Sequence, residues 1–125
     1  MSKKLPPNPS DILEFHDNIT IANKTGMYET VSVDLEKVIE SWKSSLFSYE
    51  WISKDGFKDP KDLSEKDRGR REEFERAIEE GTPVEKPILG IGVFDNVEIG
   101  AGRAVVLTAY ILGARALPVH IPASQ

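Results

Sequence analysis

The 125-residue chain has no cysteine, which excludes disulfide bonds, zinc–thiolate sites and thiol nucleophiles. Its net charge of −5 lacks the basic excess with which proteins usually neutralise nucleic-acid phosphates, so we expect a protein partner or a small ligand instead. With only His16 and His120 available, we do not expect a histidine-based metal site either.

The length of the chain fits one domain, preceded by a short arm. Residues 1–10 (MSKKLPPNPS) are proline-rich and polar, which predicts an extended arm outside the core, followed by a single domain over residues 11–125. No apolar run approaches the roughly 20 residues of a membrane span, and the N-terminus has no apolar signal region. We therefore expect a cytoplasmic protein that does not enter a membrane.

Two short β-like runs open the predicted domain. NITIA (residues 18–22) and MYETVSV (residues 27–33) are separated by NKTG, in which Gly26 can take a positive φ. This pattern predicts a hairpin formed by the two runs.

An amphipathic helix is predicted next, over residues 34–47. Asp34 is a candidate N-cap, and the apolar residues after it follow helical spacing, with Leu46 on the buried face. Residues 48–62 then carry turn signals at Asp-Gly and Asp-Pro, which indicate a loop or a short hairpin.

A second, highly charged helix is predicted over residues 64–80, which begin with a capping-box pattern and end before Gly81. Its apolar residues lie only in the second half, so we expect the first half to be solvated or docked on something outside this chain. That first half contains the densest basic cluster of the sequence, at Arg68, Arg70 and Arg71. Acidic neighbours surround the cluster, which favours an exposed helix with local ion pairs over a basic binding surface.

The most apolar part of the chain follows a linker at residues 81–87. Strands are expected at residues 88–94 and 97–99 on either side of a tight Asp-Asn turn, then a helix at residues 103–112 and a last strand at residues 116–121. Together with the earlier elements, this order predicts an α+β fold, a small mixed sheet with packed helices.

The last predicted strand contains His120, between Pro118 and Pro122. We favour a structural histidine at the edge of the sheet, because a catalytic base needs an orienting partner that the sequence does not reveal.

The loop Gly100-Ala101-Gly102-Arg103, before the last helix, is the main candidate binding site. Flexible glycines, the free N–H groups of a helix start and one arginine can together hold a phosphate or a carboxylate. The lysine and hydroxyl of a Walker loop are missing, and the glycine spacing does not fit a dinucleotide fingerprint. The same residues can equally form a tight turn in which glycines let a strand pack against a helix.

Residues 86–121 resemble the core of the ParB/sulfiredoxin fold. The features that carry the resemblance are a Pro-Ile before a strand, a hairpin turn, a glycine-started helix ending in Leu-Gly, and a closing strand with Pro-Val. In this chain they are Pro87-Ile88, Asp95-Asn96, Gly102, Leu112-Gly113 and Pro118-Val119. The resemblance implies a ParB/sulfiredoxin-like fold, whose active members bind nucleotide phosphates with a basic motif where this helix begins.

The chain departs from that motif. If the helix is aligned through Leu112-Gly113, the basic pair falls on Ala104 and Val105; aligned by the glycine-to-arginine spacing, the loop keeps Arg103 alone. The lack of cysteine excludes sulfiredoxin activity, and the extra domains with which partitioning proteins clamp DNA do not fit in this length. Other members hydrolyse nucleic acid or nucleotides with an acidic residue near the loop, which makes Glu98 a candidate catalytic residue. The plainer interpretation of Glu98 is a solvent-facing strand residue.

Three functions stay open. The first is a non-catalytic binding or regulatory protein on a ParB/sulfiredoxin-like scaffold, acting through protein contacts in a plasmid, phage or secretion-related system. The second is a small nuclease or NTPase that uses Glu98 and Arg103 on a nucleic acid or a nucleotide with Mg²⁺. The third is a homo-oligomer in which the helix at residues 103–112 packs between subunits. We favour the first, because the loop keeps its glycines but little of its charge.

Overall fold

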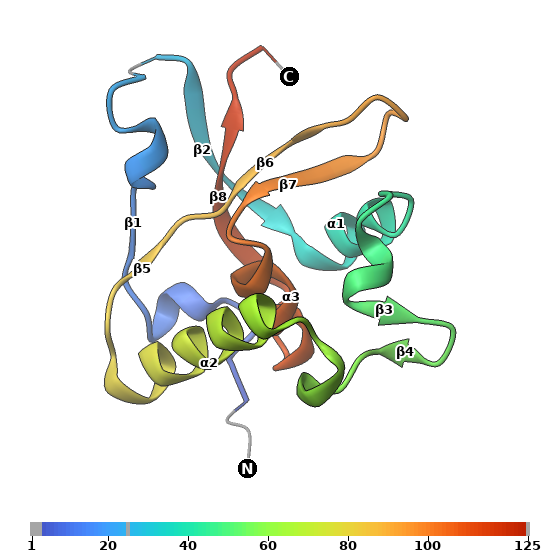
Figure 1. Ribbon diagram of the computed structural model, residues 1–125. Coiled ribbons are helices and arrows are strands. Elements are labelled where there is room, and N and C mark those ends of the chain that lie inside the picture. The colour runs from blue at the N-terminus through green and yellow to red at the C-terminus, as the bar shows by residue number, and fades with distance from the viewer. Residues whose placement is uncertain (1–3, 25, 125) are drawn as a thin grey trace.

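The computed structural model describes residues 4–24 and 26–124, and its central element is a four-stranded sheet (Figure 1). In spatial order the strands are β2 (Tyr28–Asp34), β8 (Ala116–Pro122), β6 (Ile88–Ile91) and β7 (Val97–Ala101). β8 runs antiparallel to β2 and parallel to β6, and β6 runs antiparallel to β7. The sheet is therefore mixed, as the sequence predicts.

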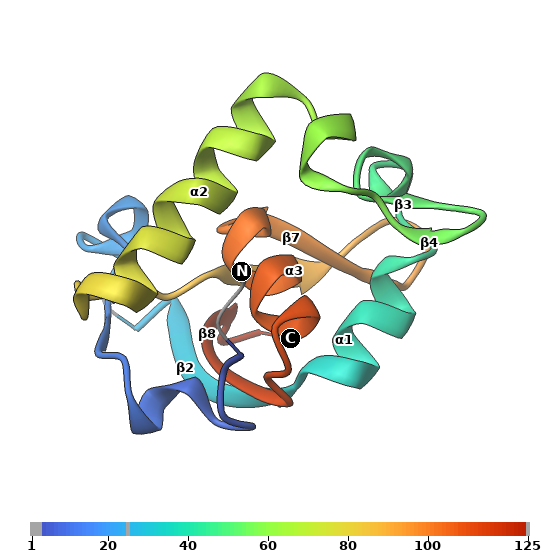
Figure 2. The same ribbon diagram turned by 90° about the horizontal axis from the view of Figure 1, so that it is seen from below.

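Three α-helices pack together beside the sheet. They are α1 (Leu35–Trp42), α2 (Glu65–Glu80) and α3 (Arg103–Ile111). Figure 2 shows α3 lying between α1 and α2. Because α3 lies at the centre of the core, it is apolar on almost every side. Its fully buried residues are Val106, Leu107, Thr108 and Ala109. These elements confirm the predicted α+β class.

Short elements complete the fold. The 3₁₀ helices are η1 (Pro9–Asp11), η2 (Ile19–Ile21), η3 (Ser48–Glu50) and η4 (Pro60–Asp62). Two small ladders pair β1 (Phe15–His16) with β5 (Val84–Glu85), and β3 (Ile52–Ser53) with β4 (Gly56–Phe57). The β3–β4 ladder is the short hairpin that the Asp55-Gly56 turn signal predicts.

The hairpin predicted from residues 18–22 and 27–33 is wrong. The Asn18 side chain accepts a hydrogen bond from the Thr20 N–H at 3.0 Å and caps η2, so residues 19–21 are helical. β2 pairs instead with β8 over seven residues, at the other end of the chain. A two-stranded hairpin is marginal on its own, whereas pairing inside a four-stranded sheet buries apolar surface as well.

The first helix begins where the sequence predicts and ends earlier. Asp34 is the N-cap, and its carboxylate accepts hydrogen bonds from the N–H groups of Glu36 and Lys37. The helix stops at Trp42, because serine side chains bond to the backbone just beyond it; Ser45 Oγ accepts from the Phe47 N–H at 3.1 Å. Leu46 is consequently 71% exposed rather than buried.

The charged helix α2 also begins and ends as predicted. Ser64 Oγ accepts a hydrogen bond from the Asp67 N–H, and Gly81 ends the helix in the left-handed conformation. Its first half is solvated on the outer side, as expected, where Glu65, Lys66, Arg70 and Glu72 are exposed. The expectation fails on the inner side, because Asp67 and Arg71 are buried within this chain. Charged groups make that inner face, so an apolar pattern does not reveal it.

The N-terminal segment is packed against the domain. Residues 1–3 of the predicted arm lie outside the described residues. Leu5 and Pro9 are buried, and the Leu5 N–H donates to the Leu112 carbonyl at 2.8 Å. The carbonyl of Pro7 accepts hydrogen bonds from the N–H groups of Arg115 and Ala116. Leu5 thus belongs to the core, although the sequence favours an arm outside it.

Candidate binding cleft

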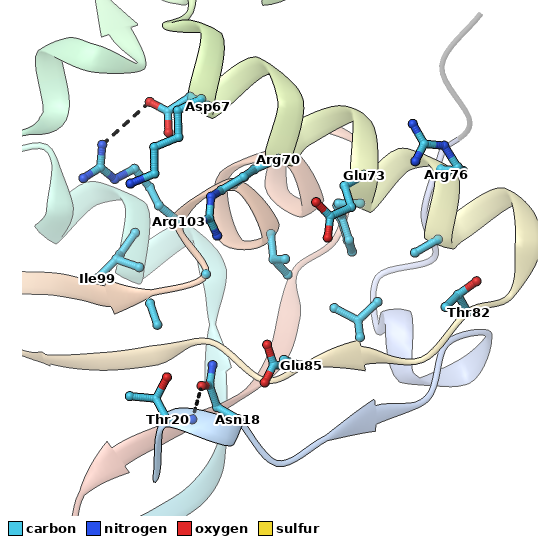
Figure 3. A pocket seen from close by; sticks show the side chains of 18 of the residues that line it. Asn18, Thr20, Asp67, Arg70, Glu73, Arg76, Thr82, Glu85, Ile99 and Arg103 are labelled. Atoms are coloured by element: carbon cyan, nitrogen blue, oxygen red, sulfur yellow. Dashed lines mark hydrogen bonds and ion pairs between the residues drawn. The ribbon is translucent and has the colours of Figure 1, made fainter. Parts of the chain in front are cut away.

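A cleft of about 720 Å³ lies between α2 and the segment that joins β7 to α3 (Figure 3). β5 forms its lower wall, and Asn18 and Thr20 at η2 form its far edge. Its volume is within the range of small-ligand sites, which is about 300–1,000 Å³.

The cleft has apolar groups on its walls and charged side chains of both signs. The apolar residues are Phe74, Ala77, Pro83, Val84, Ile99, Ala101, Ala104 and Val105. The acidic residues are Glu50, Asp67, Glu73, Glu80 and Glu85, and the basic ones are Lys66, Arg70, Arg76 and Arg103. Because acidic groups slightly outnumber basic ones, the cleft as a whole does not attract polyanions.

The predicted loop Gly100–Arg103 lines this cleft with all four of its residues. Gly100 and Ala101 are the last residues of β7, and Gly102 is the residue before α3, with φ of 79°. A Cβ at Gly102 would lie 3.0 Å from Cα of Pro87. Glycine is therefore required here both by its left-handed conformation and by the close approach of Pro87.

Arg103 does not point freely into the cleft. Its Nη1 donates to Oε1 of Glu50 at 2.8 Å and lies 3.8 Å from Oδ2 of Asp67. Its guanidinium carbon also lies 5.7 Å from the centre of the Phe47 ring, a cation–π distance. Two carboxylates of this chain therefore neutralise the one cation of the loop.

Glu98 does not line the cleft with the loop. Its neighbour Ile99 does, and since successive strand residues point to opposite sides, Glu98 faces away. Ser45 Oγ donates to Oε1 of Glu98 at 2.6 Å, and Asn96 Nδ2 donates to Oε2 at 3.1 Å. The two candidate groups of the second function, Glu98 and Arg103, are thus held by different partners.

The basic cluster of α2 is divided by the helix. Arg70 lines the cleft, Arg71 is buried with its Nε 3.8 Å from Glu75 Oε1, and Arg68 lies outside the cleft. Lys66, which the sequence analysis does not single out, lines the cleft beside Arg70. Its spacing of four residues from Arg70 is a usable sequence signal, because such residues share a helix face. Neither Lys66 nor Arg70 has a hydrogen bond or ion pair with any residue the structure describes.

His120 anchors the far edge of the cleft. β8 lies between β2 and β6, so His120 is buried inside the sheet and the predicted edge position is wrong. Its Nε2 accepts a hydrogen bond from the Asn18 N–H at 3.1 Å, and its Nδ1 lies 3.4 Å from Thr30 Oγ1. An acceptor Nε2 requires neutral imidazole with the proton on Nδ1. Burial lowers the pKa of His120, although the carboxylate of Asp17 opposes this effect.

An ion pair lies beside this histidine. Lys86 Nζ donates to Oδ1 of Asp17 at 3.0 Å, and this hydrogen bond, with the charge of Lys86, lowers the pKa of Asp17. Asn18 Nδ2 also donates to the Lys86 carbonyl at 3.0 Å. These contacts hold the segment before η2 on the sheet, and they give His120 a structural role.

Within residues 4–24 and 26–124, no group of three or more histidine, aspartate or glutamate side chains is arranged to hold a metal ion. In the same residues no helix has the length and apolar character needed to cross a bilayer. Comparisons of the chain with protein-family models, with curated proteins and with solved structures find no match.

Proposed function

We propose that this chain is a non-catalytic binding protein that holds a segment of a partner protein in the cleft between α2 and the Gly100–Arg103 loop. The observation that carries the proposal is the pairing of Arg103 with Glu50 at 2.8 Å and with Asp67 at 3.8 Å. A loop whose single cation is neutralised from within has little attraction left for a phosphate.

Two neighbouring positions support the same conclusion. Ala104 and Val105, on which one alignment of the ParB/sulfiredoxin-like motif places the basic pair, both line the cleft. Apolar side chains at these positions suit a peptide better than a nucleotide phosphate. The order of β6, β7, α3 and β8, with Gly102 directly before α3, is the support for a ParB/sulfiredoxin-like scaffold.

The composition of the cleft indicates the kind of partner. Apolar walls bordered by charges of both signs fit a polypeptide segment that carries apolar and charged side chains. We propose that this partner is met in the cytoplasm and that binding is regulatory, within a plasmid, phage or secretion-related system.

A pair of matched variants tests this proposal. Arg70→Glu reverses a charge inside the cleft, and Arg68→Glu makes the same change on the same helix outside it. We expect affinity capture from extracts of the source cells to give a partner that wild type and Arg68→Glu retain and Arg70→Glu loses. A partner retained equally by both variants would show that binding does not use the cleft.

The second function, a nucleotide- or nucleic-acid-processing enzyme, has one observation in its favour. Lys66 and Arg70 line the cleft together with Gly100–Arg103, and they have no partner among the described residues. Two such cations are able to bind the phosphates of a Mg²⁺–nucleotide in place of Arg103.

Calorimetric titration with ATP and with CTP, each with Mg²⁺, separates the two functions. Under the binding-protein proposal, neither nucleotide gives heat with the wild type. Binding by the wild type that is lost in Arg103→Ala, or in Lys66→Ala with Arg70→Ala, would replace the proposal with the enzyme. Removing the carboxylates that neutralise Arg103, by Glu50→Gln with Asp67→Asn, is expected to increase any nucleotide binding.

A further inference from the structure

The segment at the far edge of the cleft has few apolar contacts with the rest of the molecule. Residues 17–21, which we call the edge segment, include Asn18 and Thr20 of the cleft lining and end with η2. Of the three residues of η2 only Ile21 is buried, and Ile19 is 78% exposed. A segment with so little buried apolar surface opens at a low cost in free energy, so its position depends on its hydrogen bonds.

Three hydrogen bonds of Asn18 and Ile19 hold the edge segment in place. The Asn18 N–H donates to Nε2 of His120 at 3.1 Å, and Asn18 Nδ2 donates to the Lys86 carbonyl at 3.0 Å. The Ile19 N–H donates to Oε2 of Glu85 at 2.7 Å, and Figure 3 shows Glu85 near Asn18 at this edge. Of these three acceptors, the imidazole is the group whose ordinary pKa lies near neutral pH.

The neighbours of His120 keep its imidazole neutral in this arrangement. Two charged groups face it: Oδ1 of Asp17 lies 3.9 Å from Nε2, and Lys86 Nζ donates both to that carboxylate and to Thr30 Oγ1. β6 and η2 contain no charged residue. Thr30 Oγ1 lies 3.4 Å from Nδ1 and accepts its proton, while Nε2 accepts from the Asn18 N–H.

Protonation of His120 removes the acceptor of the Asn18 N–H. The imidazolium carries a proton on each nitrogen, so two N–H groups would face each other across 3.1 Å inside the protein. The carboxylate of Asp17, one residue earlier in the chain, is able to accept the new Nε2 proton if the edge segment moves, because it lies 3.9 Å away. Burial lowers the pKa of His120, so as the pH falls below the ordinary value of 6.5, protonation favours a state in which the segment has moved and the imidazole is hydrated.

We propose that His120 and the edge segment form a pH-sensitive switch, in which protonation of the imidazole releases residues 17–21 from the sheet and opens the far edge of the cleft. In the closed state Nε2 accepts from the Asn18 N–H, and in the open state Nε2 donates to Asp17. Because Asn18 and Thr20 line the cleft, the open state holds a partner segment less tightly. This effect on the partner rests on the proposed function, whereas the release of the edge segment does not.

Hydrogen exchange, followed for each amide by NMR, tests the release. The Thr20 N–H donates to Asn18 Oδ1, and the Ile21 N–H donates to the Asn18 carbonyl. From about pH 7.5 to about pH 5.5, we expect the protection factors of these two amides to fall about fivefold or more, the effect of losing one hydrogen bond. The buried amides of α3 report global unfolding and are expected to be better protected at both pH values. Edge amides that are as well protected as those of α3, or whose protection does not change with pH, would overturn the proposal.

Three variants assign the effect to His120. His120→Gln keeps an acceptor oxygen and does not titrate, so the edge segment is expected to stay closed at both pH values. His16→Gln, at an exposed position, is expected to behave as the wild type. Asp17→Asn, at a side chain that is 75% exposed, removes the carboxylate that favours the imidazolium, so its fall in protection is expected at lower pH. The same fall in His120→Gln as in the wild type would contradict the switch.

A partner obtained by affinity capture tests the effect on the cleft. We expect the wild type to release this partner on washing at about pH 5.5, and His120→Gln to retain it. Equal retention by the two proteins, with the edge segment open in the wild type, would overturn the regulation of the cleft. If capture gives no partner, the proposed function is contradicted, and the exchange measurements still decide whether the edge segment is released.

Discussion

Nη1 of Arg103 lies 2.8 Å from Oε1 of Glu50, and this ion pair closes the loop end of the cleft. Glu50 is the last residue of η3, and Arg103 is the first residue of α3, so the pair joins two segments that are far apart in the sequence. Because the pair neutralises Arg103, the glycine–arginine loop presents backbone groups and apolar surface to a ligand, and no free cation.

This ion pair is expected to contribute measurably to stability. In a double-mutant cycle with Glu50→Gln and Arg103→Gln, we expect a coupling of about 1 kcal/mol, because the pair is short but partly exposed. Denaturant unfolding of the four proteins measures it. The pair of Lys43 and Glu40, which is more exposed and spans one helical turn, is the control and is expected to show less coupling. Equal couplings in the two cycles would contradict this prediction.

The stability of the protein is expected to fall as the pH drops below about 6.5. Burial lowers the pKa of His120 in the folded protein, so as the pH falls the imidazole is protonated in the unfolded chain before it is protonated in the folded protein. This protonation stabilises the unfolded state relative to the folded state. Protonation would also place a proton on Nε2, where the Asn18 N–H now donates. Thermal unfolding across this pH window measures the effect.

His120→Gln is expected to remove this part of the pH dependence, while His16→Gln, at an exposed position, is expected to keep it. The pKa of Asp17 is lowered by Lys86, so the stability that Asp17 contributes is lost only at pH below about 3.8, in a separate window. If His120→Gln and the wild type gave the same profile below pH 6.5, the role assigned to His120 would be wrong.

The two glycines of the loop are expected to respond differently to the same substitution. Gly102→Ala is expected to lower the free energy of unfolding by about 1–3 kcal/mol, because φ is 79° and the new Cβ would lie 3.0 Å from Pro87. Gly100→Ala places its Cβ 3.6 Å from the Ile88 carbonyl oxygen, an ordinary contact, and is expected to cost less. Chemical denaturation of both variants measures the difference, and similar losses would count against this account of the loop.

Two leucines test where the core ends. Leu117→Ala, at a fully buried position of β8, is expected to destabilise the protein by about 3 kcal/mol. Leu46→Ala is expected to change the free energy of unfolding by less than about 0.5 kcal/mol, because Leu46 is 71% exposed. Both are measured at low concentration, so that association does not contribute. A large loss at Leu46 would restore it to the apolar face that the sequence pattern predicts.

Local signals explain the parts of the fold that the sequence predicts. Helix ends depend on residues within one helical turn, so they follow from neighbouring residues. The starts of α1, α2 and α3 are at Asp34, Ser64 and Gly102, and α2 ends at Gly81. The spacing of apolar residues over residues 88–121 likewise predicts two strands, a helix and a further strand in that order. This order of elements predicts the α+β class.

The predictions that failed depend on partners far away in the sequence. The seven-residue ladder between β2 and β8 replaces the local hairpin, and it places His120 inside the sheet. Asp67 is buried next to Arg103, which no apolar pattern of α2 indicates.

The sequence by itself determined the helix boundaries set by caps, the α+β class and the position of the glycine–arginine loop before a helix. Only the tertiary structure decided that Arg103 is neutralised, that Glu98 faces away from the loop and that Lys66 and Arg70 share the cleft with it. The physical reason is the separation along the chain between the residues that interact. Capping and periodicity act between neighbours along the chain, whereas the charge of a site depends on which distant side chains the fold brings within a few ångströms.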